Sequence, residues 1–249
     1  MAKERDTELW IGIKLGILHG IPVSIKELFK SFAASSNLGL AAYVNWVSFE
    51  DGALIKVIKQ FGGIPFVKTN VPQLCMIPET VNNIFGWTLN PLNKEWTCGG
   101  SSGGEGALVA SGCSIVGIGD DVAGSVRIPA AYCGVYGFKS GTKRATKKST
   151  MMNERWCDEA IALPEILPVT SPIANCIDDL AIMYSIINSK EMFEYDYYTP
   201  TSPFEYQKYE DLSKRNHKLR IGYFEYDGWF TCTPPVINTI RYAWDQLKS

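Results

Sequence analysis

A segment rich in glycine and serine carries the strongest chemical signal in the sequence. It runs from Cys98 to Ala107 as Cys-Gly-Gly-Ser-Ser-Gly-Gly-Glu-Gly-Ala, and a second glycine-rich string extends from Gly117 to Pro129. Glycines beside serines let the backbone turn tightly and direct several N–H groups into one cavity. Such a cavity can hold a phosphate, or the oxyanion that forms during acyl transfer. Apolar patterned segments flank the first string, which argues against a flexible linker.

Other glycine motifs fit this region less well. There is no Gly-x-x-x-x-Gly-Lys-Ser/Thr phosphate loop, and the second string lacks the third glycine of a dinucleotide fingerprint. Residues 99–103 match the Gly-x-Ser-x-Gly nucleophile elbow of α/β-hydrolases, with Asp178 or Asp179 and then His217 following in the required order. That elbow needs a buried strand directly before its serine, and residues 91–97 lack the pattern of one.

An acyl-transfer enzyme with this sequence needs a base other than histidine, because the chain has only His19 and His217. Lys26 is the candidate, since it ends the short apolar run from Ile21, where a charged ammonium is expensive to bury. Desolvation favours the neutral amine, which can take a proton from a serine hydroxyl. A lysine that extends from a strand end into solvent is the alternative interpretation of the same spacing.

Five strings together resemble the amidase signature enzymes, and among these the fatty acid amide hydrolases most of all. They include Gly-Ile-Pro-Val-Ser-Ile-Lys-Glu at residues 20–27 and Asp-Val-Ala-Gly-Ser-Val-Arg-Ile-Pro at 121–129; the others lie at 65–73, 99–107 and 131–139. The likeness extends over roughly residues 15–248. It implies an α/β fold in which helices sandwich a mixed central sheet, and chemistry that needs no metal or cofactor.

The resemblance also implies a role for individual residues. Lys26 corresponds to the catalytic lysine, Ser101 to a bridging serine that follows a cis peptide and contacts substrate, and Ser125 to the acyl nucleophile. Protons would pass from Ser125 through Ser101 to Lys26, and an acyl-enzyme would form. Cys75 corresponds to a substrate-binding position. The expected oxyanion hole consists of the backbone N–H groups of Val122, Ala123, Gly124 and Ser125.

The sequence departs from the family pattern at several positions. Ala123 replaces a glycine, Asp120 replaces a small polar residue beside Asp121, Cys75 replaces a methionine, and no proline follows Lys139. Family members are also considerably longer. We therefore expect residues 1–249 to form one partial amidase signature domain without its C-terminal half, with an open sheet edge, exposed apolar surface and weak stability.

The resemblance implies a serine hydrolase that cleaves fatty acid amides or related amides and esters. One alternative is a glutamine-hydrolysing amidotransferase subunit, which Glu105 disfavours because such subunits generally carry a small residue there. The other alternative is an inactive truncated fragment. The expected partner is a lipophilic small-molecule amide and not nucleic acid. The sequence leaves open whether the protein forms a homodimer. It also leaves open whether regions beyond this chain contact a membrane peripherally.

Amino-acid composition limits the classes of protein to which the chain can belong. The 249 residues are 46% hydrophobic and 20% charged, as in ordinary globular proteins, and the net charge of −2 argues against a nucleic-acid surface. Seven cysteines without a Cys-x-x-Cys motif favour reduced thiols over disulfides or zinc. The charged first residues do not resemble a secretory signal, and the uncharged run Ser31–Phe49 is too polar for a membrane span. We expect an intracellular protein, cytoplasmic or peripheral to membranes.

The elements that must position these residues follow from hydrophobic patterning. Strands are expected at 21–26 and 64–68, joined by a helix that Asp51 caps and Gly62-Gly63 closes, and this order predicts a crossover with parallel pairing. Residues 90–104 are expected to form a loop that enters a helix near Gly106. Further strands are expected at 114–119, 135–139 and 219–224. Further helices are expected at 126–133, from Asn175 or Asp178 to Ile187, and from Thr233 to Leu247, with a long connection at 189–215.

Overall fold

The computed structural model describes residues 1–13, 15–142, 144–145, 149–151, 167–196, 202–214 and 220–248. The chain divides into two compact units, Met1–Tyr206 and Gln207–Ser249. All residues of the candidate site lie in the first unit.

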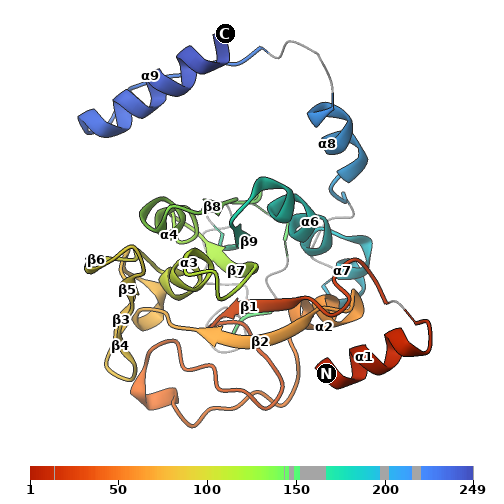
Figure 1. Cartoon of the computed structure of the whole chain (residues 1–249). Helices are drawn as coiled ribbons and strands as arrows, with labels where there is room; N and C mark the ends of the chain where they lie inside the picture. Colours follow the sequence, from red (N-terminus) through yellow and green to blue (C-terminus); the bar gives the residue numbers. More distant parts are fainter. Residues whose placement is uncertain are drawn as a thin grey trace. The chain divides into compact units, whose positions relative to one another are not determined.

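A five-stranded mixed sheet forms the centre of the first unit (Figure 1). Its strand order is β2-β1-β7-β9-β8. β1 pairs in parallel with β2 and with β7, whereas β9 is antiparallel to β7 and to β8. The expected mixed sheet is therefore confirmed. The strands are β1 (Pro22–Lys26), β2 (Ile64–Thr69), β7 (Val116–Asp121), β8 (Tyr136–Gly137) and β9 (Val169–Ala174).

Helices cover both faces of this sheet. α3 (Gly103–Ala110) packs on β1, β2, β7 and β9, with α4 (Arg127–Cys133) beside it. Residues of α2 (Ala53–Gln60), α6 (Ile177–Ile187) and α7 (Lys190–Tyr195) build a large apolar cluster with the other side of the strands. Strand side chains alternate between faces, so Val23 and Ile25 enter this cluster while Ser24 and Lys26 point toward the α3 side.

The first unit also contains several shorter elements. Two hairpins pair β3 (Val81–Asn82) with β4 (Gly86–Trp87) and β5 (Leu89–Asn90) with β6 (Asn93–Thr97). Two 3-10 turns, η1 (Ala41–Tyr43) and η2 (Gln73–Cys75), and the N-terminal helix α1 (Ala2–Trp10) complete the unit. None of the helices in the described residues is long and apolar enough to cross a membrane.

The second unit consists mainly of helices. α8 (Tyr206–Ser213) begins at the boundary between the units, and α9 (Pro234–Lys248) is its longest element. Within this unit Tyr223 stacks on Trp244 with ring centroids 4.5 Å apart, and Arg241 forms a two-point ion pair with Glu225. No residue of α9 is buried, although the sequence predicts an inward apolar face for this helix.

Several expectations about helix and strand ends are wrong. Gly52, not Asp51, is the N-cap of α2, because the Asp51 carboxylate instead accepts hydrogen bonds from the Phe32 N–H and from Lys59. Cys176 is the N-cap of α6, in place of Asn175 or Asp178. β2 is an edge strand with half-exposed residues and not a buried strand.

Other differences concern whole elements. The expected loop at 90–104 contains the end of β5, all of β6 and the start of α3, and the expected connection at 189–215 contains α7 and α8. Residues 220–224 form no strand, and residue 219 lies outside the described residues. β9 was not predicted, because Pro172 in its middle is atypical of an internal strand.

Candidate active site

Lys26 and Ser101 form a hydrogen-bonded pair in the interior. The Lys26 side chain is completely buried at the carboxyl end of β1, and its Nζ lies 2.7 Å from Ser101 Oγ. Ser101 is only 1% exposed and lies in the turn that leads into α3. The Gly100–Ser101 peptide is cis, as the resemblance implies. Lys26 therefore does not extend into solvent.

Ser125 lies in the loop between β7 and α4, next to the turn that carries Ser101. Its backbone carbonyl accepts a hydrogen bond of 3.0 Å from the N–H of Ser102, the neighbour of Ser101. The residue is partly buried. Within the described residues no hydrogen bond joins the hydroxyls of Ser101 and Ser125. Of the two contacts that the implied proton path requires, the structure contains the one between Lys26 and Ser101.

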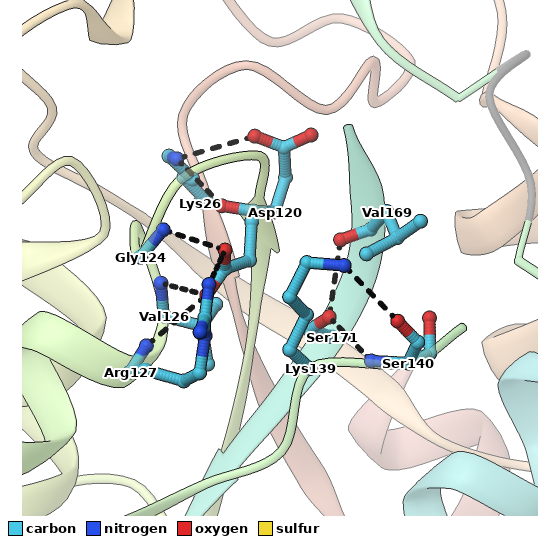
Figure 2. Close-up of polar contacts among 10 residues, drawn as sticks. Lys26, Asp120, Gly124, Val126, Arg127, Lys139, Ser140, Val169 and Ser171 are labelled. Atoms are coloured by element: carbon cyan, nitrogen blue, oxygen red, sulfur yellow. Dashed lines mark hydrogen bonds and ion pairs between the residues drawn. The ribbon is translucent and has the colours of Figure 1, made fainter. Parts of the chain in front are cut away.

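Asp121 fixes the loop that carries Ser125, and Figure 2 labels three of the residues that it contacts, Gly124, Val126 and Arg127. Its buried carboxylate accepts hydrogen bonds from the N–H groups of Gly124 at 2.8 Å, Val126 at 3.1 Å and Arg127 at 3.3 Å. The Arg127 guanidinium adds two further bonds, of 3.1 and 3.0 Å. Burial alone would raise the pKa of Asp121, but the Arg127 side chain and the three backbone donors hold it below its ordinary value.

The same loop determines which N–H groups are free. The Gly124 N–H, one of the four expected oxyanion donors, is engaged by Asp121. The N–H groups of Val122, Ala123 and Ser125 make no hydrogen bond within the described part of the chain. Gly124 has a φ of +121°, which favours glycine, whereas the φ of Ala123 is not positive, so the methyl group there causes no backbone strain. Three of the four expected donors therefore have no hydrogen-bonding partner among the described residues.

Cys75 lies beside this pair, at the end of η2. Burial raises the pKa of its thiol to about 11, while the charge of Lys26 and a hydrogen bond with Ser101 act in the opposite direction. The thiol is therefore protonated at neutral pH. The structure places the predicted substrate-binding position next to the predicted bridging serine.

Two buried carboxyl groups also lie near Lys26, and neither was among the site residues predicted from the sequence. Asp120, at the end of β7, places Oδ1 3.5 Å and its backbone oxygen 3.3 Å from Lys26 Nζ. Burial raises the pKa of Asp120, and the attraction of Lys26 lowers it. The sequence feature that could have indicated Asp120 is the Asp-Asp pair directly after an apolar run. Successive side chains at a strand end point to opposite sides, so one of the two carboxylates must face the Lys26 side of the sheet.

Glu105 is the second buried carboxyl group, and it projects from α3 onto the sheet. Its two oxygens accept hydrogen bonds of 2.6 Å from Ser24 Oγ and Thr69 Oγ1, on β1 and β2. Burial raises its pKa to about 7, against the effect of the two hydroxyl donors and of Lys26. Gly117 makes room for it, since a Cβ there would lie 1.9 Å from Glu105 Oε2.

The nucleophile-elbow interpretation does not fit this geometry. The strand before Ser101 is β6, which belongs to a two-stranded hairpin and is mostly exposed. Asp178 and Asp179 lie in the first turn of α6, and His217 lies outside the described residues. Among the described residues no group of three His, Cys, Asp or Glu side chains is arranged to hold a metal ion.

The fold is a mixed sheet between helices, and its candidate site is a buried lysine–serine pair beside a glycine-rich loop. Both features match the class of amidase signature folds. The chain belongs to the Amidase family, whose model matches residues 1–249.

Relatives and solved structures agree with this assignment. The chain is 40% identical over 226 residues to the vitamin D3 hydroxylase-associated protein of Gallus gallus, covering 91% of this chain and 47% of the relative. It is 36% identical to fatty-acid amide hydrolase 1 of Sus scrofa, covering 89% and 36%. A solved fatty acid amide hydrolase superimposes with a TM-score of 0.81 and 28% identity over 99% of this chain and 42% of that one. The chain spans less than half the length of these relatives.

Proposed function

We propose that this protein is a serine hydrolase that cleaves amide bonds through an acyl-enzyme, with fatty acid amides or related amides and esters as its substrates. The observation that carries the proposal is the buried Lys26–Ser101 hydrogen bond of 2.7 Å next to the Ser125 loop. A lysine kept out of water and bonded to a serine hydroxyl is equipped to act as a base. The likeness to fatty acid amide hydrolases supports the substrate class.

The proposed reaction moves protons along three residues. Ser125 Oγ attacks the carbonyl carbon, its proton passes to Ser101, and the Ser101 proton passes to Lys26. The free N–H groups of Val122, Ala123 and Ser125 stabilise the tetrahedral oxyanion. The proton then returns along the same path to the leaving nitrogen as the C–N bond breaks. Water hydrolyses the remaining ester and regenerates the Ser125 hydroxyl.

The environment of Ser125 favours a nucleophile over a purely structural serine. Asp121 holds the loop through three backbone N–H groups, which fixes Ser125 on a short turn directly before α4. The Ser102–Ser125 backbone hydrogen bond joins this turn to the one that carries Ser101. This link between two separate loops supports the proposal that both serines keep a fixed position relative to the lysine.

A fluorophosphonate probe tests the proposal directly, because it reacts with activated serine hydroxyls. Mass spectrometry of the labelled protein should locate the adduct on Ser125. Ser125→Ala should abolish labelling, and Lys26→Ala should slow it by about 10²–10⁴-fold, the usual contribution of a general base. Ser111→Ala, which removes an exposed hydroxyl, is the matched control. Labelling that persists on Ser101 in Ser125→Ala would contradict the proposed roles.

Substrate assays then separate the substrate classes. A long-chain acyl amide, the corresponding ester and glutamine should be compared under the same conditions. Hydrolysis of the acyl amide that is lost in Ser125→Ala supports the proposal. Ammonia release from glutamine alone would instead support the amidotransferase subunit.

A further inference from the structure

We infer that Asp120 is the charge partner of Lys26, and that it sets the pH above which the serine relay operates. This inference rests on the proposed function and deepens it. Asp120 does not contact the reacting atoms, so it is a positioning residue that acts through the lysine. At low pH its carboxylate would keep Lys26 protonated and the site inactive. As the pH rises, Lys26 would lose its proton and the site would become active.

The contacts of Lys26 match those of an ammonium group. An ammonium has three N–H donors and no acceptor, whereas a neutral amine has two donors and a lone pair. Lys26 Nζ has three oxygen neighbours: Ser101 Oγ at 2.7 Å, the Asp120 backbone oxygen at 3.3 Å and Asp120 Oδ1 at 3.5 Å. Asp120 thus supplies two of the three acceptors. Figure 2 shows both of its contacts with Lys26.

Asp120 can exert a strong influence because the pair is buried. The Lys26 side chain is 0% exposed and that of Asp120 is 12% exposed, so water screens their attraction poorly. An opposite charge within about 4–6 Å moves a titration by about 1–3 pH units toward the charged form. A small polar residue in place of Asp120 would retain the backbone acceptor and lose this charge.

Other titratable groups near Lys26 do not replace Asp120. The Glu105 carboxyl is occupied by the hydroxyls of Ser24 and Thr69, and burial raises its pKa to about 7. The Cys75 thiol, with a pKa of about 11, carries no charge at neutral pH. Asp121 is paired with Arg127. Among the described residues Asp120 is the only carboxylate with a direct contact to Lys26 Nζ.

The consequence concerns the order of proton transfers. Lys26 must release a proton to water before it can accept the proton of Ser101, and Asp120 opposes that release. Activity should therefore rise with pH along a limb governed by Lys26. Removing the carboxylate should move this limb to lower pH, so that the variant reacts faster than the wild type on the acidic side.

The test is the rate constant of fluorophosphonate labelling of Ser125, measured over about pH 5–10 to cover the range of lysine titration. Asp120→Asn removes the charge and keeps the shape, and Asp120→Thr is a second variant that restores a small polar side chain. Both should reach half-maximal labelling about 1–3 pH units below the wild type. Glu95→Gln removes an exposed carboxylate and should follow the wild-type profile. Urea unfolding confirms that each variant is folded.

Three results would overturn the inference. Profiles of both Asp120 variants that superimpose on the wild-type profile would show that the carboxylate does not control the base. A uniform loss of labelling at every pH would show that Asp120 is itself a required proton acceptor. Absence of Ser125 labelling in the folded wild type at every pH would overturn the proposed function, and this inference with it.

Discussion

Glu105→Gln should remove a pH dependence of stability that the fold imposes on a buried carboxyl group. Glu105 is fully buried, and among the described residues its oxygens accept hydrogen bonds only from the hydroxyls of Ser24 and Thr69 and contact no cation directly. The neutral acid suits this environment, because hydroxyl donors compensate a buried negative charge only in part. Burial accordingly raises its pKa to about 7 from an ordinary value of 4.5.

The sign and size follow from proton linkage. The unfolded chain releases the Glu105 proton near pH 4.5, whereas the folded protein retains it until about pH 7. The resulting stabilisation is fully present below pH 4.5 and is lost as the pH rises through about 7. Each pH unit of difference corresponds to about 1.4 kcal/mol, so this residue withdraws about 3 kcal/mol over that interval. Such a change is a large fraction of the free energy of unfolding of a typical domain.

Urea unfolding of the wild type and of Glu105→Gln, at a series of pH values, measures this effect. Glutamine cannot ionise, so the variant should gain about 3 kcal/mol relative to the wild type between about pH 4.5 and 7. Any difference in hydrogen bonding with Ser24 and Thr69 adds an offset that does not depend on pH. Glu95→Gln removes an exposed carboxylate and controls for the loss of one negative charge.

Two outcomes would refute this reasoning. A constant difference between Glu105→Gln and the wild type would mean that Glu105 does not change protonation over this interval. A variant that becomes less stable than the wild type as the pH rises would mean that the ionised carboxylate is the stabilised form. In that case the attraction of Lys26 would outweigh burial.

Three other substitutions or reagents probe the same region. Asp121→Ala should destabilise the protein by about 1–3 kcal/mol in urea unfolding, because it leaves buried N–H groups of the loop without their acceptor, while the half-exposed Arg127 guanidinium can turn to solvent. Gly117→Ala should cost about 1–3 kcal/mol in the same assay, since its Cβ would clash with Glu105, and a cost near zero would show that the site relaxes freely. Iodoacetamide near neutral pH should alkylate exposed Cys113 before Cys75, whose pKa is about 11, and peptide mapping would reveal the opposite order.

The sequence predicted the parts of the fold that follow from strong local patterns. β1, α2 and β2 combine apolar periodicity with glycine stops, and their parallel pairing follows from the short crossover between them. β9 escaped prediction because Pro172 opposes a central strand, and its burial between β7 and β8 arises only from tertiary packing. The predicted N-caps of α2 and α6 were wrong. The Asp51 carboxylate, predicted to cap α2, forms hydrogen bonds elsewhere, and a cysteine side chain caps α6.

The candidate site residues were predicted from side-chain chemistry and from the resemblance, and not from hydrophobic patterning. Lys26 was predicted because burying a charged group at the end of an apolar strand is costly, and Ser101 and Ser125 were predicted from the resemblance. The occupation of the Gly124 N–H by Asp121 could not be predicted, since it depends on the direction in which one backbone amide points. The role of Glu105 was equally hidden, because its partners Ser24 and Thr69 lie on two different strands.

Asp120 and Asp121 show most clearly what three-dimensional structure adds. They are neighbours in the sequence and share one chemistry, yet at the end of β7 one carboxylate meets Lys26 and the other meets Arg127 and the Ser125 loop. The Arg127 side chain and three backbone N–H donors lower the pKa of Asp121, whereas burial raises that of Asp120. Substitution of Asp121 should therefore act on loop geometry and stability, and substitution of Asp120 on the pH profile. Among the described residues the two carboxylates have no hydrogen-bonding partner in common. The double variant Asp120→Asn/Asp121→Ala should therefore combine the lower pH of half-maximal labelling of the first variant with the lower urea midpoint of the second.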